Sequence, residues 1–402
     1  MKSPSKVSTL ILLSLTEMMA MGVWFSASAV VPILTRLWQL DASGQAWLTM
    51  SVQIGFVVGA LGSAIFNLAD RVAADRLLAI SSVAAGLCTT SIPLFASSLT
   101  PALFFRFLSG MFLARVYPVG MKLVATWTKE DRGVGIGLLV GALTVGTAFP
   151  HLLRIFGSLD EWKIVLYIAA FFAVLGGMVS FLFVRPGPYA AKNPPFNWHY
   201  VGYIFRNREI LMANLGYLGH MWELYAMWTW APIFLALSFS QSGLNPKWAS
   251  IWAFTIIAIG GLGSTIAGRL ADRIGRTSVT IGSLLISGLC CLIAGFLYGG
   301  EPVVLVGLFL IWGFAVVADS AQFSACISEL AHPEYIGTAL TLQTSLGFLL
   351  TLVTIRLLPN LVTWVGWHWA FSFLILGPIV GIWAMAKLRR SPAAVKLANG
   401  HR

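Results

Sequence analysis

Charged and polar side chains that lie inside apolar stretches are the residues of this 402-residue chain that could do chemistry. A charge at the centre of a bilayer costs about 2.5 to 3.5 kcal/mol on insertion scales, so such residues normally face a cavity or a partner. They fall in four of the apolar stretches: Glu17, Arg106, Arg115, His220, Glu223 and Asp319. We take them as the starting set of candidate site residues.

The acids and the histidine in this set have the chemistry for binding and releasing protons. A carboxylate held away from water can stay protonated near neutral pH, and histidine titrates in the same range. His220, Glu223 and Trp230 share one helix face, and the seven-residue spacing from Glu223 to Trp230 repeats from Glu17 to Trp24. The alternative is structural hydrogen bonding between helices. The predicted proton-coupling residues are Glu17, His220, Glu223 and Asp319.

The two buried arginines offer the chemistry for binding an anion, because a guanidinium matches a carboxylate or a phosphate with two parallel hydrogen bonds. Arg106 and Arg115 are nine residues apart, about 180° around a helix, so both cannot face one cavity. Aromatic side chains near the same depth could shape a pocket, although most tryptophans in a membrane protein lie at the interface or pack. The predicted substrate-binding residues are Arg106, Tyr117, Trp24, Trp230 and Gln322.

The elements that must position these residues are membrane-spanning helices. The chain is 58% hydrophobic and only 10% charged, whereas a soluble chain is about 25% charged. These values exclude an ordinary water-soluble enzyme. Twelve apolar stretches are each long enough to span a bilayer as a helix: 8–35, 44–66, 77–97, 101–125, 133–156, 162–184, 210–238, 247–268, 278–299, 302–327, 336–358 and 364–386.

The basic residues of the chain indicate its orientation. Of the 26 lysines and arginines, 19 fall on the side of the membrane that holds both termini and five on the other. That asymmetry places both termini in the cytoplasm of a bacterial-type inner membrane. The net charge of +11 therefore records topology, and we expect no nucleic-acid partner. The four cysteines lie in apolar stretches and predict packing, not a disulfide or metal site.

An internal repeat divides the chain into two halves. The sequence Leu68-Ala69-Asp70-Arg71 recurs 202 residues later as Leu270-Ala271-Asp272-Arg273, at the same helix end in each half. The longest polar interruption, rich in proline and basic residues, separates the sixth and seventh stretches. We predict an N-terminal six-helix bundle over 1–184, a cytoplasmic linker over 185–208 and a C-terminal six-helix bundle over 209–402.

The second copy of this motif, Gly268 to Arg276 (GRLADRIGR), resembles the signature loop of the major facilitator superfamily. The first copy is degraded, since both glycines are missing and Asp75 stands at a basic position. The resemblance implies an all-α membrane protein of twelve transmembrane helices in two pseudo-symmetric six-helix bundles. It also implies a conformational latch, formed by Asp70, Arg71, Asp272, Arg273 and Arg276. The alternative is that these charges only anchor the loops.

A second segment that resembles the superfamily covers about 40 residues. It includes Arg106, Gly110, Pro118, Trp127, Arg132 and Gly133. It resembles the organic anion:cation symporter branch of the superfamily, near the nitrate-nitrite porters. Leu113 departs from the branch, which often has an acid at that position. The resemblance favours Arg106 as the arginine that faces the cavity, where it would meet an anion or pair with Glu17 or Glu223. Arg115 would then pair between helices or extend toward the cytoplasm.

These observations predict a secondary active transporter that moves a small organic anion, such as a carboxylate, by proton-coupled alternating access. The alternative is a proton-driven efflux pump for amphipathic drugs or metabolites. A transporter-like sensor or a polytopic membrane enzyme fits less well, because no soluble signalling domain and no nucleophile-base set is recognisable. The expected partners are a small-molecule substrate, protons and lipid, with no cofactor or metal, and the protein is expected to be monomeric.

Overall fold

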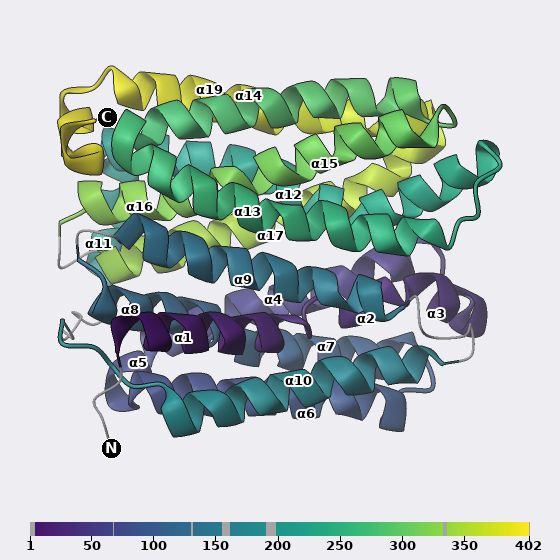
Figure 1. Cartoon of the computed structure of the whole chain (residues 1–402), viewed down its shortest axis with the longest axis horizontal. Coiled ribbons are helices and arrows are strands. Elements are labelled where there is room, and N and C mark those ends of the chain that lie inside the picture. The colour runs from purple at the N-terminus through teal and green to yellow at the C-terminus, as the bar shows by residue number, and fades with distance from the viewer. Residues whose placement is uncertain are drawn as a thin grey trace. The chain divides into compact units, whose positions relative to one another are not determined.

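The computed structural model describes residues 5–66, 68–129, 132–154, 161–189, 198–332 and 336–401. All regular elements in these ranges are helices, which confirms the predicted all-α class (Figure 1). The chain forms two compact units, Met1–Pro195 and Phe196–Arg402. The boundary falls inside the polar segment 185–208, of which residues 190–197 lie outside the described part of the chain.

The first unit begins with a broken helix. Ser5 caps α1 by accepting a hydrogen bond from the Ser8 amide, and Asp41 caps α4 through the Gly44 amide at 2.7 Å. The helices of this unit are α1 (Lys6–Met21), α2 (Ser26–Ala29), α3 (Val31–Trp38), α4 (Ala42–Ile65), α5 (Leu68–Arg71), α6 (Ala74–Phe95), α7 (Leu99–Leu113), α8 (Tyr117–Trp127), α9 (Arg132–Leu153) and α10 (Trp162–Phe183).

The second unit is built around α12, which has 34 residues and begins at the cap residue Asn207. Its helices are α11 (Trp198–Arg206), α12 (Arg208–Gln241), α13 (Trp248–Ile274), α14 (Arg276–Ala294), η1 (Gly295–Leu297), α15 (Pro302–Ala318), α16 (Ser320–Leu330), α17 (Ile336–Val365), α18 (Trp367–Ala370), η3 (Phe371–Ile375), α19 (Leu376–Arg389) and η4 (Pro392–Gly400).

Ten helical spans in the described residues are long and apolar enough to cross a membrane. The two other predicted stretches, 8–35 and 210–238, are helical but different in kind. A turn over 22–25 ends α1 after 16 residues, so no single helix covers 8–35. α12 has 34 residues and is not among the ten spans, so its length is not what separates it from them. Both exceptions hold candidate site residues.

Helices pack in the same order within each unit, as the internal repeat predicts. α4 packs on α7 as α13 packs on α15, and α6 packs on α10 as α14 packs on α19. α1 packs on both α9 and α10, and α12 packs on both α17 and α19. Each unit is therefore one copy of the same helical arrangement.

Glycines allow the closest of these helix contacts. A methyl group at Gly59 of α4 would overlap the Met111 carbonyl of α7, and one at Gly263 of α13 would overlap the Phe314 carbonyl of α15. Gly110 and Gly313 make the reciprocal contacts against α4 and α13. Small residues let helix backbones approach closely in membranes, where packing drives helix association.

Both units break a helix at the matching position. α7 ends at Leu113 and α8 starts at Tyr117, while α15 and α16 meet at Asp319. The two composite spans, Leu99–Trp127 and Pro302–Leu330, each have 29 residues. Tyr117 and Asp319, which are 202 residues apart, therefore stand at equivalent breaks.

We expect Gly110→Ala to destabilise the protein by about 1 to 3 kcal/mol, because the new methyl group would press on the α4 backbone. Gly62→Ala in the same helix pair is the matched control: its Cβ meets open space, so it should be neutral or stabilise the helix by about 0.5 to 1 kcal/mol. Unfolding of the detergent-purified protein measures both. Equal stability of the two variants would contradict the packing argument.

Candidate functional site

The first polar site lies between α1 and α8 in the first unit. Glu17 on α1 is fully buried, and neither carboxylate oxygen has a hydrogen-bond partner among the described residues. Gly120 of α8 leaves room for it, since a Cβ there would lie 2.9 Å from Glu17 Oε2. Tyr117, at the start of α8, lies within electrostatic range of the same carboxylate. The structure thus brings two predicted site residues together at a helix break.

The second polar site occupies the corresponding place in the second unit. His220 of α12 and Asp319, at the break before α16, are both 1% exposed, with Nδ1 2.9 Å from Oδ1. The rings of Tyr217 and Phe323 flank the imidazole, with centroids 6.1 and 5.6 Å away. An apolar and aromatic wall therefore encloses an acid-base couple.

The two sites are counterparts in the internal repeat. Asp319 follows Tyr117 by 202 residues, and His220 follows Glu17 by 203. α1 begins at Lys6 and α12 at Arg208, again 202 residues apart. In the register set by these helix starts, Gly219 is the counterpart of Glu17, His220 is the next residue, and Glu223 lies about one turn further along α12.

Glu223 forms a different site, one turn further along α12. Its carboxylate accepts hydrogen bonds from Ser287 Oγ at 2.9 Å, from Cys291 Sγ at 3.3 Å and from the Trp312 indole. It therefore links α12 to α14 and α15. Trp230, which was predicted to share a helix face with His220 and Glu223, donates from Nε1 to the Ile355 carbonyl of α17 at 3.1 Å. His220, Glu223 and Trp230 therefore contact different neighbouring helices.

Arg106 is fully buried in α7 and donates to three backbone carbonyls. Nε lies 3.1 Å from Leu48 O, Nη1 lies 2.9 Å from Val23 O, and Nη2 donates to Trp24 O. Val23 and Trp24 belong to the turn that ends α1, where the Val23 carbonyl also accepts hydrogen bonds from Ser26 N and Ser26 Oγ. Arg106 therefore caps the broken helix. In the described part of the chain it does not form the alternative ion pair with Glu17.

Arg115 and Trp24 complete the predicted residues of this unit. Arg115 lies in the turn between α7 and α8, is half-buried, and donates from Nη1 to the Met111 carbonyl at 3.3 Å. Trp24 is fully buried and packs edge-on against Phe56 at 5.3 Å. Of the two arginines, Arg106 is the one enclosed by the helices.

One buried histidine outside the predicted set shares this region. His151 of α9 is 2% exposed, and both its ring nitrogens lack a hydrogen-bond partner in the described part of the chain. Its ring lies 6.3 Å from that of Phe25 in the turn after α1. A lone histidine near the end of an apolar stretch gives little sequence signal for such a position.

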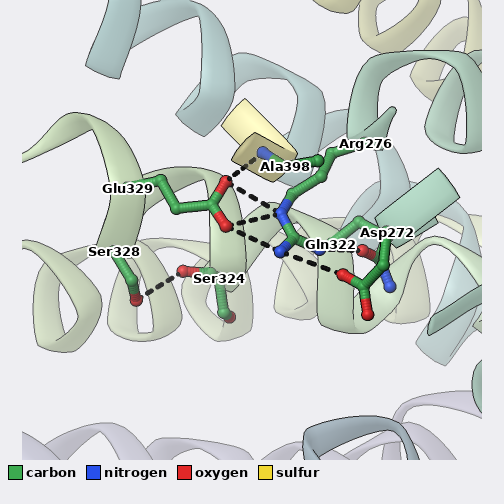
Figure 2. A network of polar contacts seen from close by, with 7 residues as sticks. All are labelled: Asp272, Arg276, Gln322, Ser324, Ser328, Glu329 and Ala398. Atoms are coloured by element: carbon green, nitrogen blue, oxygen red, sulfur yellow. Dashed lines mark hydrogen bonds and ion pairs between the residues drawn. The ribbon is translucent and has the colours of Figure 1, made fainter. Parts of the chain in front are cut away.

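Two of the five predicted latch residues, Arg276 and Asp272, form an ion pair in a polar cluster at the start of α14, which is called the latch below; its conformational role stays a prediction (Figure 2). Nε lies 2.8 Å from Glu329 Oε2 and Nη2 lies 2.6 Å from Oε1, so the pair is bidentate. Nη2 also lies 3.4 Å from Asp272 Oδ1, and Nη1 donates to Gln322 Oε1 at 2.9 Å. The predicted substrate residue Gln322 is thus engaged by the latch, and its contact with substrate stays a prediction.

Of the other predicted latch residues, Arg273 and Arg71 are exposed, and the side chain of Asp70 lies outside the described residues. Glu329, which the sequence interpretation left out of the latch, is its central acid. The available signal was weak: Glu329 is a single acid at the end of an apolar stretch, with no local motif around it.

No group of three or more histidine, cysteine, aspartate or glutamate side chains that could hold a metal ion occurs among the described residues. The four cysteines are free thiols. The site chemistry consists of buried acids, one histidine couple and one enclosed guanidinium.

Comparison with known proteins shows similarity to three bacterial transport proteins. The chain is 24% identical over 298 residues, 64% of each chain, to the glycerol-3-phosphate transporter of Bacillus subtilis. It is 22% identical over 359 residues to the benzoate transport protein of Acinetobacter baylyi, covering 79% of this chain and 75% of that one. It is 25% identical over 213 residues to the inner membrane metabolite transport protein YhjE of Escherichia coli, covering 48% of each.

The family profile gives the broader result. The profile described as Major Facilitator Superfamily matches residues 13–355 and 249–402, which together cover nearly all of the sequence. The two-unit helical repeat and the GRLADRIGR loop agree with this match. The chain therefore belongs to the Major Facilitator Superfamily.

Proposed function

We propose that this protein is a secondary active transporter that moves a small organic anion across a bacterial inner membrane, coupled to protons, by alternating access of its two units. Membership of the superfamily and similarity to transport proteins support the transport activity. Two of the relatives are named for glycerol 3-phosphate and benzoate, which are both anions at neutral pH. The excess of basic residues supports a cytoplasmic position for both termini.

The observation that best supports an anionic substrate is the buried, unpaired charge of Arg106. A guanidinium is always charged and has five N–H donors, and a buried charge is costly unless it is paired. Its three hydrogen bonds are to neutral carbonyls, and no carboxylate in the described part of the first unit lies within ion-pair distance. An anion that enters beside Arg106 would supply the missing charge. Arg106 would then serve both the helix break and the substrate.

His220 and Asp319 are the best-supported proton site. Their nitrogen and oxygen lie 2.9 Å apart inside an apolar wall, so loss or gain of one proton changes the net charge of an enclosed couple. Glu17 is the second candidate, because its buried carboxylate has no hydrogen-bond partner in the described residues. Glu223, which already accepts three hydrogen bonds, is better suited to holding helices together.

Arg106→Gln should reduce uptake of benzoate and glycerol 3-phosphate into proteoliposomes by about 100-fold or more, while Arg106→Lys, which keeps the charge, retains part of the activity. The matched control is Arg115→Gln, which should stay within a few-fold of the parent protein because Arg115 is half-exposed. Melting temperatures check that each variant is folded. Full uptake by a folded Arg106→Gln variant, or transport of lipophilic cations in place of anions, would overturn the anion assignment.

Asp319→Asn and His220→Asn should separate proton coupling from substrate movement. Both variants should lose accumulation driven by an imposed proton gradient, yet retain exchange of labelled for unlabelled substrate without a gradient. For comparison, Glu223→Gln turns an acceptor into an N–H₂ group that faces donors, so it should chiefly lower the melting temperature. If Glu223→Gln alone lost coupling, the proton site would lie there instead.

A further inference from the structure

The segment that follows the last long helix of the second unit folds back onto the latch. η4, Pro392–Gly400, packs against α13, α16 and α19 and lies at the same end of the unit as the end of α16 (Figure 1). Ala394, Leu397 and Ala398 are buried. Figure 2 shows the Ala398 amide directed at Glu329, to whose Oε2 it donates at 3.0 Å.

Glu329 therefore has two kinds of partner on its two oxygens. Arg276 binds it in a bidentate ion pair, while the main chain of the C-terminal segment supplies a further charge-assisted hydrogen bond. The segment reaches the acid through an unusual backbone curl. Ala398 and Asn399 have φ of 46° and 55°, a left-handed conformation that is unfavourable for residues other than glycine.

The first unit has a similar contact, in which the chain after the last long helix packs back on the unit; we call each of these contacts a clasp. The segment after α10 is held on the end of α8, where the Gly187 amide donates to Thr126 Oγ1 at 2.7 Å and the Tyr189 amide to Thr126 O at 3.0 Å. Glu329 lies 203 residues after Thr126, so the same position receives the returning chain in both units. The recurrence argues that the contact is part of the repeated architecture and not a chance contact of a chain end.

The two clasps place their charges differently. Ala74 and Trp127 stand 202 residues before Arg276 and Glu329, so the first unit lacks both members of that ion pair. Its returning segment is held by Thr126 and by an ion pair of its own, from Arg185 Nη1 to Asp75 Oδ2 at 3.5 Å. In the second unit the returning segment carries no charge to the contact, and its Ala398 amide shares the Glu329 carboxylate with the buried guanidinium of Arg276.

We propose that residues 391–401 are a releasable strap whose docking site is the Arg276–Glu329 pair, and that the strap controls how readily the ends of α13, α14 and α16 separate. Docking buries Leu397 and completes the hydrogen bonding of Glu329. Release lets residues 398 and 399 leave the unfavourable left-handed conformation. It also removes the hydrogen bond from the Ala398 amide, so that Glu329 keeps only its contact with Arg276.

Hydrogen–deuterium exchange of the purified full chain tests this strap without any transport measurement. Leu397→Asp places a charge in the buried anchor, so amide exchange should rise about tenfold or more at 271–278 and 326–331 while 126–129 in the other unit stays unchanged. Lys396→Ala, at an exposed position of the same segment, is the matched control and should match the parent protein. No local increase in Leu397→Asp, or an equal increase throughout the second unit, would overturn the proposal.

A second variant covers the case in which Leu397→Asp fails to fold. Ala398→Gly keeps the amide donor and removes the unfavourable left-handed alanine, so it should strengthen docking and slow exchange at 326–331 by about two- to fivefold. Unchanged or faster exchange in Ala398→Gly would show that the curl is not what limits docking and would contradict the strap.

Discussion

A helix that breaks inside a membrane protein must find new partners for the backbone groups it releases, because lipid offers none. Two carbonyls of the turn after α1 accept hydrogen bonds from Arg106, a side chain from a helix more than 80 residues away, and the Val23 carbonyl also accepts from Ser26. These hydrogen bonds offset part of the cost of burying the guanidinium. Breaks, buried ionisable residues and candidate chemistry therefore coincide in this structure for one physical reason.

The two units use one backbone plan for different chemistry. At the break between the paired helices, one unit has Tyr117 facing Glu17 and the other has Asp319 facing His220. One carboxylate lacks a hydrogen-bond partner among the described residues, while the other is coupled to an imidazole. The repeat therefore supplies two equivalent positions that carry different ionisable groups.

Much of the fold could be predicted because membrane insertion is governed by local sequence. Apolar stretches predicted the ten spans, and the 202-residue repeat predicted the two-unit plan. The partners in the sites could not be predicted in this way. Periodicity reports which face a side chain occupies, but not which helix packs there. Glu223 meets Ser287 and Trp312, which are 64 and 89 residues away.

The same limit explains the individual errors. The seven-residue spacing from Glu17 to Trp24 repeats from Glu223 to Trp230, but the helix starts at Lys6 and Arg208 fix a register in which Glu223 lies about one turn beyond the counterpart of Glu17. Glu329 carries no motif of its own, and only the returning chain and Arg276 reveal its role. Residues that act through a distant partner leave little trace in their own neighbourhood.

The glycine contacts have a mechanical consequence. Where the backbones of α4 and α7, or of α13 and α15, touch without intervening side chains, there is no layer of rotatable groups to absorb a displacement. A small movement imposed at one end of such a pair is carried along its length as a tilt. Each unit then behaves as a stiff lever, and deformation is concentrated at the interrupted helices, where the ionisable residues lie.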